Sequence, residues 1–248
     1  MKLYDQHVHS LFSYDSSAVR LASVDAARLR GVAGLTFTEH YETLVPEQRA
    51  VFLPEDFARV GVELGSGQLA PLETYEYLQA RPFDIVLGSI HFDPDGVDYY
   101  QYIPESRAAH IENMRRYFEF HLPLIEDGQF DIIAHLGYPL RYNNRFGLTM
   151  EQLRADEAAG ETLQKVLKAI IKSGKGLELN CSGGFYPSLG ILKEYKALGG
   201  ELITLGSDSH VAGAGTDKLK QGAELLKEAG FTKYALYTER KPEWVTVN

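Results

Sequence analysis

Two histidines stand one residue apart near the start of the chain, in the hexapeptide DQHVHS over residues 5–10. The preceding residues, KLY, predict a short strand, and residues i and i+2 of a strand point to the same face. His7 and His9 would therefore project side by side. Neutral imidazole is the commonest side-chain metal ligand, so the pair predicts half of a metal site. Two surface histidines would give the same pattern, and the rest of the chain must decide.

Further metal-ligating residue types stand at or just past the ends of other apolar runs, and six of the eight histidines in the chain have this placement. The residues are His7, His9, His40, Glu63, His91, His135, Asp208 and His210. Histidines scattered over a surface would not follow most of the strands. In parallel α/β barrels the carboxyl ends of the strands meet at one mouth, where active-site groups lie. The placement therefore predicts one convergent ring of ligands.

The elements that must position this ring alternate along the chain. Apolar runs predict strands over 2–9, 34–40, 59–65, 84–92, 131–137, 176–182 and 202–210. Helical patterns cover 23–32, 70–81, 104–128, 149–174 (as one helix or two), 189–200 and 217–231. Alternation of this kind predicts βαβ units and a parallel sheet of the α/β class, and about seven strands are enough to close a barrel. Residues 234–248 predict a short terminal strand or an extended tail.

The ligand inventory, with Asp15 added, is too large for one ion. It suits two or three borderline divalent ions such as zinc, manganese or iron, and the absence of a thiolate from the set favours a catalytic site over a structural one. Three divalent ions with three carboxylates and one bridging hydroxide would retain a charge of about +2, which matches a phosphate monoester dianion. The ions would make the hydroxide available near neutral pH, for in-line attack without a covalent protein intermediate.

Composition limits the classes of protein that need consideration. The chain has 248 residues, 44% of them hydrophobic, which is enough for one large domain over residues 1–248. No apolar stretch approaches the length of a membrane span, and the first residues lack the apolar core of a signal peptide. One cysteine, Cys181, fits a reducing cytoplasm. A net charge of −9 without a Lys/Arg block makes nucleic acid an improbable partner, whereas a small phosphorylated substrate is compatible with it.

The motifs DQHVHS, YDSS, TEH, GVELG, LGSIHF, AHLG, LELNCSG and LGSDSH follow one another over nearly the whole chain. In this order they resemble the motif series of the PHP (polymerase and histidinol phosphatase) family. The resemblance implies a distorted seven-stranded (β/α)7 TIM-like barrel with up to three metals. Within the family, the chain is most similar to the monofunctional histidinol-phosphate phosphatases. That similarity implies a phosphoric monoester hydrolase that converts L-histidinol phosphate to L-histidinol and phosphate, a step of histidine biosynthesis.

The resemblance also implies how the ligands divide. His7, His9, Glu63 and Asp208 would hold one metal, Glu63, His91 and His135 a second, and Asp15, His40 and His210 a third. Glu63 would bridge two metals and so hold the attacking hydroxide. Gly137 stands where the resemblance implies an acidic residue, which leaves the alcohol half of the substrate open.

Two arginines beyond the His135 strand, Arg141 and Arg145, are candidates for binding phosphate, because a guanidinium matches phosphate oxygens bidentately. Both could equally be solvated loop residues. His110 and His121 fall within one helical pattern and are interpreted as structural. Cys181 is interpreted as a packing residue or as a support for the ligands, because no arginine follows at the spacing of a tyrosine-phosphatase loop. Four further polar residues are expected to orient groups at the mouth or to support ligands: Asp5, Glu39, Glu178 and Asn180.

Other functions fit parts of the pattern. The same site could act on a nucleotide phosphate or on phosphotyrosine. Amidohydrolases also begin with His-x-His, but they usually bridge two metals with a lysine on the fourth strand, where this chain has His91. A non-catalytic metal-binding module is a further alternative, although degenerate copies should lose ligands and every expected ligand position is occupied here.

Overall fold

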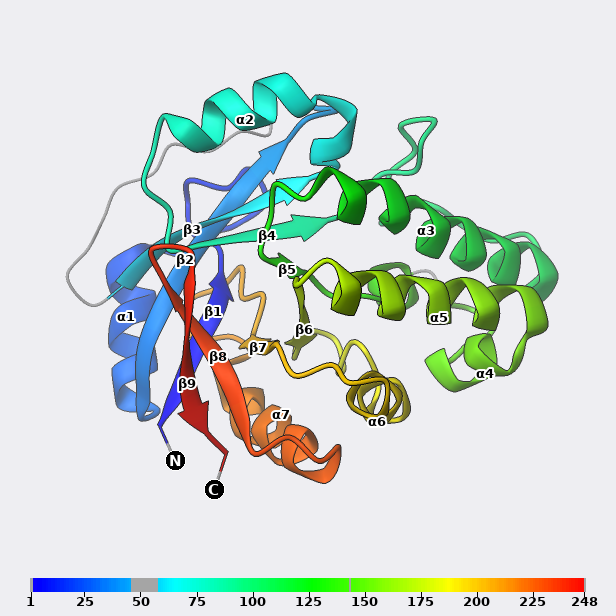
Figure 1. Cartoon of the computed structure of the whole chain (residues 1–248). Coiled ribbons are helices and arrows are strands. Elements are labelled where there is room, and N and C mark those ends of the chain that lie inside the picture. The colour runs from blue at the N-terminus through cyan, green and yellow to red at the C-terminus, as the bar shows by residue number, and fades with distance from the viewer. Residues whose placement is uncertain (1, 46–57, 143, 248) are drawn as a thin grey trace.

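Seven parallel strands form a nearly closed barrel in the computed structural model, which describes residues 2–45, 58–142 and 144–247 (Figure 1). Their order in the sheet is their order in the chain: β1 (Leu3–Val8), β2 (Val32–Glu42), β3 (Ala58–Gly65), β4 (Ile85–Ser89), β5 (Ile132–Ile133), β6 (Gly176–Asn180) and β7 (Ile203–Gly206). Between β7 and β1 there is no continuous ladder. Asp208 N donates to the His7 carbonyl oxygen at 2.7 Å, and His9 N donates to the Ser209 carbonyl oxygen at 2.9 Å. The predicted distorted seven-stranded barrel is confirmed.

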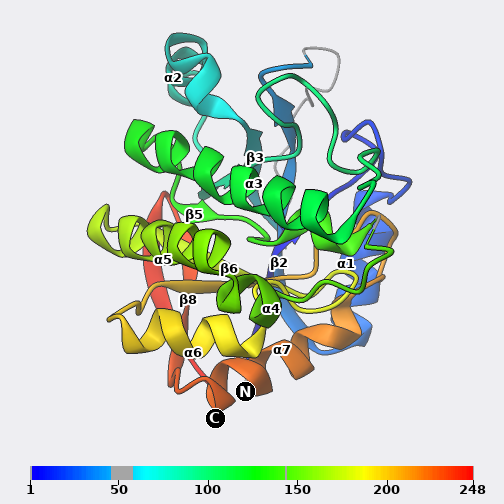
Figure 2. The ribbon, with the colours of Figure 1, turned by 90° about the vertical axis from the view of Figure 1, so that its right-hand side faces the viewer.

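Helices connect the strands and cover the outside of the barrel. They are α1 (Arg20–Leu29), α2 (Pro71–Gln79), α3 (Arg107–Asp127), α4 (Met150–Ala155), α5 (Glu157–Lys172), α6 (Leu189–Ala197) and α7 (Thr216–Glu228), with short 3₁₀ turns η1 (Gly67–Leu69) and η2 (Tyr138–Arg141). Figure 2 shows α3, α5 and α6 stacked side by side over one flank. The pattern over 149–174 forms two helices, because Asp156 has an extended backbone and its side chain caps α5 by accepting a hydrogen bond from Ala159 N. Among the helices of the described ranges, none is both long enough and apolar enough to cross a bilayer.

Helix α5 shows how the sequence pattern produces this packing. Leu163, Val166, Leu167 and Ile170 recur at helical spacing and are completely buried in the main apolar core. The strands have two buried faces, as parallel strands require. Val86 of β4 packs in this main core, whereas its neighbours Ile85 and Leu87 join a second, smaller apolar cluster.

The C-terminal segment differs from its prediction. Residues predicted as a short strand or tail form an antiparallel hairpin of β8 (Lys233–Thr238) and β9 (Lys241–Thr246). Ala235 and Tyr237 of β8 pack in the smaller apolar cluster with residues of β4 and β5. The side chain of Gln6 donates to the Ala235 carbonyl oxygen at 2.6 Å and accepts from Tyr237 N at 2.8 Å. The hairpin turn is bound to residues that precede β4 and β5, so β8 lies at the amino end of the barrel.

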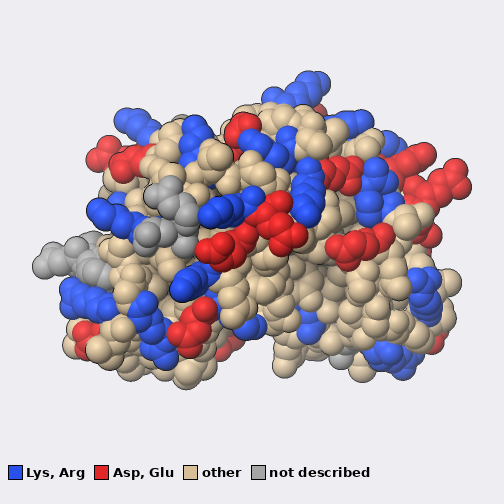
Figure 3. All heavy atoms as spheres, turned by 90° about the horizontal axis from the view of Figure 1, so that it is seen from below, with Lys and Arg blue, Asp and Glu red and all other residues tan. Residues whose placement is uncertain are grey.

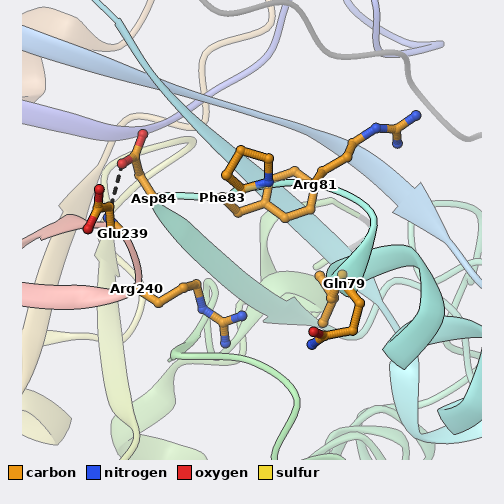
Figure 4. A pocket seen from close by; sticks show the side chains of 8 residues that line it. Gln79, Arg81, Phe83, Asp84, Glu239 and Arg240 are labelled. Carbon is orange, nitrogen blue, oxygen red and sulfur yellow. Dashed lines mark hydrogen bonds between the residues drawn. The ribbon is translucent and has the colours of Figure 1, made fainter.

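A cavity of about 400 Å³ also lies at the amino end, between the end of α2 and the hairpin turn (Figure 4). Asp84 accepts hydrogen bonds there from Glu239 N at 3.1 Å and from Val60 N at 3.0 Å. Arg240 donates to Asp131 at 2.5 Å. These charged groups hold the hairpin to the barrel, and the cavity is at the end of the strands opposite to the predicted ligands.

The packing of α5 gives a prediction about stability. Leu163→Ala should lower the free energy of unfolding by about 2–5 kcal/mol, because it removes buried methyl groups and leaves a void. Lys165→Ala on the exposed face of the same helix should change it by about 0.5 kcal/mol or less. Urea unfolding of both variants checks this, and equal losses would contradict the burial of this face.

Candidate metal centre

The structure brings all nine predicted ligand residues together at the carboxyl end of the barrel. His7, His40, Glu63 and Asp208 come from four different regions of the chain, at the ends of β1, β2, β3 and β7. His91 and His135 follow β4 and β5. Every one of the nine has a side-chain N or O atom within 3.4 Å of another member of the set. Only Asp15 and His210 are appreciably exposed, so these two mark the open side of the cluster.

The deepest group consists of His7, His9, Glu63 and Asp208, all of which are buried. The Nε2 atoms of the two histidines are 3.0 Å apart. Each Nε2 lies 3.3–3.4 Å from Glu63 Oε2 and from Asp208 Oδ1. Two imidazole nitrogens and two carboxylate oxygens therefore surround one point.

Hydrogen bonds to the other ring nitrogens decide whether this group fits a metal. His7 Nδ1 lies 2.7 Å from Glu178 Oε1, so it must carry the proton. His9 Nδ1 lies 3.1 Å from Ser13 Oγ, whose own proton goes to Glu39 Oε2 at 2.7 Å. Both Nε2 atoms of the neutral rings then direct lone pairs at each other, which is repulsive unless a cation lies between them. The donor set fits a divalent ion with four protein ligands.

A second group forms on the other oxygen of Glu63. His135 Nε2 lies 2.6 Å and His91 Nε2 lies 3.0 Å from Glu63 Oε1. The two nitrogens are 3.4 Å apart, and His91 Nδ1 is bound to Glu42 Oε1 at 2.6 Å. Glu63 thus presents one oxygen to each group, which is the geometry of a carboxylate that bridges two cations.

A third group lies toward solvent. Asp15 Oδ2 is 3.4 Å from His40 Nε2 and 3.2 Å from His210 Nε2. The ring of His9 stacks on both of those histidines, with centroid distances of 4.2 Å to His40 and 4.1 Å to His210, and the centroids of His40 and His210 are 5.7 Å apart. His40 also reaches inward, because its Nδ1 lies 3.1 Å from Glu63 Oε2. His40 therefore connects the outer group with the bridging carboxylate.

The carboxylates give the site a field that favours cations. Burial by itself would raise the pKa of Glu63, but the charges of His91, His7 and His40 hold it well below its usual range. Burial lowers the pKa of His7, and the charges of Glu178, Asp208 and Glu63 overcome that effect and raise it well above normal. Protons and divalent ions would compete for the same lone pairs, so cation binding at this site should weaken on acidification.

Two carboxylates that hold histidine tautomers occupy space left open by glycines. Glu42 pairs in register with Gly65 on β3, and a Cβ at Gly65 would lie 1.8 Å from Glu42 Oε2. A Cβ at Gly206 would lie 2.3 Å from Glu178 Oε1 and 2.5 Å from the Cβ of His7. No larger residue fits at either position while these carboxylates remain in place.

Sequence reasoning identified Glu178 as an orienting residue but missed Glu42. The signal was present, because Glu42 follows His40 by two residues on one strand and so shares its face. Glu39, which was also predicted to support a ligand, is connected to His9 through the hydroxyl of Ser13. Arg20 donates to Glu39 Oε1 at 3.2 Å. Asp5 accepts from Ser207 N at 2.8 Å, which joins β1 to the start of the Asp208 loop.

The backbone is strained at two of the cluster residues. His135 has φ 26° and Asp208 has φ 52°, in the left-handed region that side chains other than glycine rarely adopt. Each residue lies two positions beyond the last residue of a short strand. Strain of this kind is retained where the direction of a side chain matters, and here it turns an imidazole and a carboxylate toward Glu63 and His9.

The two candidate phosphate-binding arginines differ in placement. The Arg141 side chain is buried, and its Nη1 donates to Asp208 Oδ2 at 2.6 Å. Its Nε and Nη2 have no hydrogen-bond partner within the described residues. Arg145 is exposed, with its guanidinium 4.9 Å from the Phe146 ring, and no contact joins it to the cluster in the described part of the chain. Phosphate binding by Arg145 stays a prediction without a supporting contact.

The two histidines and the cysteine that are not in the ligand set are buried. His110 and His121 are buried in α3, and His121 Nδ1 is bound to the Tyr117 carbonyl oxygen at 2.8 Å. Cys181 is fully buried, and burial raises the pKa of its thiol well above normal, so it is not a thiolate nucleophile.

Gly137 has φ 118°, and a Cβ there would lie 3.0 Å from the Tyr186 ring, so an acidic side chain does not fit at this position.

The nearly closed α/β barrel and its strand-end cluster of histidines and carboxylates define a metal-binding barrel protein. A sequence model of the PHP domain matches residues 5–182, which is well over half of the chain. The chain therefore belongs to the PHP domain family, as the motif series predicts. Asp208 and His210 lie beyond the matched residues, and the structure brings them into the same cluster.

Known relatives cover the chain almost completely. A histidinol-phosphatase of Lactococcus lactis subsp. lactis (strain IL1403) is 30% identical over 271 residues, covering 97% of this chain and 96% of that protein. A probable histidinol-phosphatase of Thermotoga maritima is 30% identical over 227 residues, covering 84% of each. The crystal structure of a Lactococcus lactis histidinol phosphate phosphatase, complexed with zinc, L-histidinol and phosphate, superposes with a TM-score of 0.79 at 24% identity. It covers 98% of this chain and 99% of that one, so the two proteins share the fold throughout.

The hydrogen bond between Glu42 and His91 gives a prediction about metal affinity. Glu42→Ala should weaken binding of divalent ions by about 10–100-fold, because the ring loses the acceptor that fixes its tautomer and orientation. Glu42→Gln, which retains an acceptor oxygen, should recover part of that loss. Competition with a chelator, followed by metal analysis, measures the affinity. Glu76→Ala on exposed α2 is the matched control and should bind metal as the unmodified protein does.

Proposed function

We propose that this protein hydrolyses L-histidinol phosphate to L-histidinol and phosphate, with two or three divalent ions held by the nine cluster residues. One observation carries the proposal: Glu63 lies between two pairs of imidazoles whose Nε2 atoms are only 3.0 and 3.4 Å apart. The names of the relatives support the choice of substrate. The zinc in the related crystal structure makes zinc the first metal to test, with manganese and iron as alternatives.

The chain's own residues would prepare the reaction before substrate arrives. Glu178 and Glu42 hold the Nδ1 protons of His7 and His91, which leaves the Nε2 lone pairs available for coordination. Glu63 spaces the two inner groups. Divalent ions bound there would lower the pKa of a coordinated water toward neutrality and neutralise phosphate oxygens. Because the inner groups are buried and the outer group is partly exposed, the ester would enter from the side of Asp15 and His210.

Arg141 is placed to bind phosphate. Its guanidinium is buried beside Asp208, and two of its nitrogen atoms are unpartnered. Buried N–H groups without an acceptor are costly, and phosphate oxygens would supply the missing acceptors in charge-assisted bonds. Asp208, which binds Nη1, would hold the guanidinium in position while its other oxygen faces His7 and His9.

The charge pattern of the surface does not favour a nucleic-acid partner. On the face seen in Figure 3, basic and acidic side chains are interspersed, without the continuous basic surface that a nucleic acid would need. The only cysteine of the 248 residues is a free thiol, from which we infer a reducing compartment, the cytoplasm. We also propose that residues 1–248 act as one domain, since ligands from β1 to the loop after β7 meet at a single site.

A substrate panel tests the reaction directly. The metal-loaded protein should hydrolyse L-histidinol phosphate with a higher kcat/KM than p-nitrophenyl phosphate, a nucleoside bisphosphate or a phosphotyrosine peptide. His9→Ala should remove metal and activity together, because His9 borders both the inner and the outer group. His110→Ala should retain the metal content of the folded protein, because His110 lies in α3 away from the cluster.

Each other outcome of the panel identifies a different function. Preference for the nucleotide or the phosphopeptide would retain the phosphoesterase chemistry but replace the substrate. Hydrolysis of amides or cyclic ureas alone would identify an amidohydrolase. Bound metal without turnover of any compound would identify a non-catalytic module.

Replacing Arg141 tests the phosphate contact. Arg141→Gln should lower kcat/KM for L-histidinol phosphate by about 10–100-fold and weaken inhibition by inorganic phosphate, because a buried charge-assisted contact is lost. Metal content should stay near that of the unmodified protein. Arg145→Gln, which neutralises an exposed arginine four residues after Arg141, should have a smaller effect. If Arg145 proved the more sensitive position, the assignment of the phosphate contact would be reversed.

A further inference from the structure

A carboxylate outside the ligand set, Asp98, lies in the loop that connects β4 to α3. The loop is attached to the site, because Tyr99 N donates to the His91 carbonyl oxygen at 2.9 Å. Asp98 Oδ1 accepts from Tyr100 N at 2.8 Å. Across residues 2–45, 58–142 and 144–247, no hydrogen bond or ion pair engages its other carboxylate oxygen. Asp98 is partly exposed, so that oxygen is accessible to a ligand.

Backbone contacts hold Asp98 next to His91, at the mouth of the cluster. Burial raises the pKa of Asp98, while the bond from Tyr100 N and the charge of His91 lower it. The carboxylates of Glu42 and Asp15 add to the increase. Asp98 pairs with Phe92 in an antiparallel bridge, and the next residue, Tyr99, donates to the His91 carbonyl oxygen, so Asp98 lies beside the backbone of His91.

Tyrosine side chains surround the same opening, and we call Tyr14, Tyr100, Tyr138 and Tyr142 the tyrosine rim. The ring of Tyr14 lies 5.3 Å from that of His40, and the ring of Tyr138 lies 4.9 Å from that of His91. Tyr142 continues the series at 5.1 Å from Tyr138, and Tyr100 follows at 4.7 Å from Tyr142. Three of the rings are exposed: Tyr14, Tyr100 and Tyr142. Grouped exposed aromatic rings beside a polar site are typical of a ligand surface.

We propose that Asp98 and the tyrosine rim bind the alcohol half of the substrate and select alcohols that carry a protonated amine. The inference rests on the proposed function and names the specificity residues of that site. L-Histidinol carries an ammonium group and an imidazole ring. The free oxygen of Asp98 would accept a hydrogen bond from the ammonium group, and the rim would cover the flat ring, since aromatic faces attract cations and stack on heterocycles.

Among the described residues of the site, no other carboxylate is available for this purpose. The remaining ones face imidazole, guanidinium or hydroxyl groups: Asp15, Glu39, Glu42, Glu63, Glu178 and Asp208. Arg141 and any bound divalent ions attract the phosphate dianion and repel an ammonium group. A substrate with opposite charges at its two ends would thus be oriented by the two sides of the mouth, with phosphate toward the ions and the amine toward Asp98.

The substitution Asp98→Asn tests this role with little change in shape. Its amide oxygen can still accept from Tyr100 N, so the loop should keep its conformation while the charge is lost. We expect kcat/KM for L-histidinol phosphate to fall about tenfold, mainly through KM, as for the loss of one charge-assisted bond. Activity on p-nitrophenyl phosphate, which has no ammonium group, should stay within about twofold. Asp95→Asn is the matched control, because it removes one charge from the same loop at an exposed residue that faces Arg116.

A pair of simple esters separates this inference from the proposed function. O-phosphoethanolamine and ethyl phosphate differ in the ammonium group, and their kcat/KM values, or their inhibition constants against p-nitrophenyl phosphate, measure selection for it. The unmodified protein should prefer the aminated ester, and Asp98→Asn should abolish the preference. Equal losses on charged and neutral esters, or no loss on either, would overturn the inference. If L-histidinol phosphate is not hydrolysed but the preference exists and depends on Asp98, the proposed function fails and the inference stands.

Discussion

The arrangement of the site depends on one buried carboxylate, that of Glu63, which has imidazole nitrogens on both of its oxygens. A bare carboxylate would not be stable at this depth without positive charge nearby. Its neighbours can supply that charge as protons or leave their lone pairs to divalent ions. In the second state the Nδ1 protons held by Glu178 and Glu42 make Nε2 the coordinating atom of His7 and His91. The barrel holds these groups close together despite the electrostatic cost of burying them.

Several features of the backbone and the packing near the ligands accommodate the burial of these charged groups. Gly65 and Gly206 give room to the carboxylates that orient two histidines, and His135 and Asp208 have left-handed backbones next to strand ends. Buried Arg20 lies against Glu39 and over the ring of Phe37 at 4.7 Å, so even the support of His9 is charged and enclosed. The elements nearest the ligands have little conformational freedom, as expected for a site that must hold several cations at fixed spacing.

Much of the fold and the ligand set could be predicted from sequence, because parallel strands share one end and polar residues at strand ends must meet there. His40 and His91, far apart in the chain, were placed together by that rule alone. The hairpin of β8 and β9 could not be predicted, since its position depends on hydrogen bonds between Gln6 and residues near 235. Glu42 was missed because its role depends on the space at Gly65, which only the strand register reveals. Asp98 lies in a loop whose path no periodic pattern describes.

The position of β8 has a consequence for how the protein can form. Gln6 lies next to His7, and within the described part of the chain its side-chain amide is bonded to residues about 230 positions later. A chain without its last hairpin would leave that amide unpaired and expose the apolar side chains of Ile85 and Ile132 at the floor of the barrel. The first ligand strand and the final hairpin are therefore stabilised together. Because contacts between such distant residues form slowly, the cation cluster should be completed late in folding.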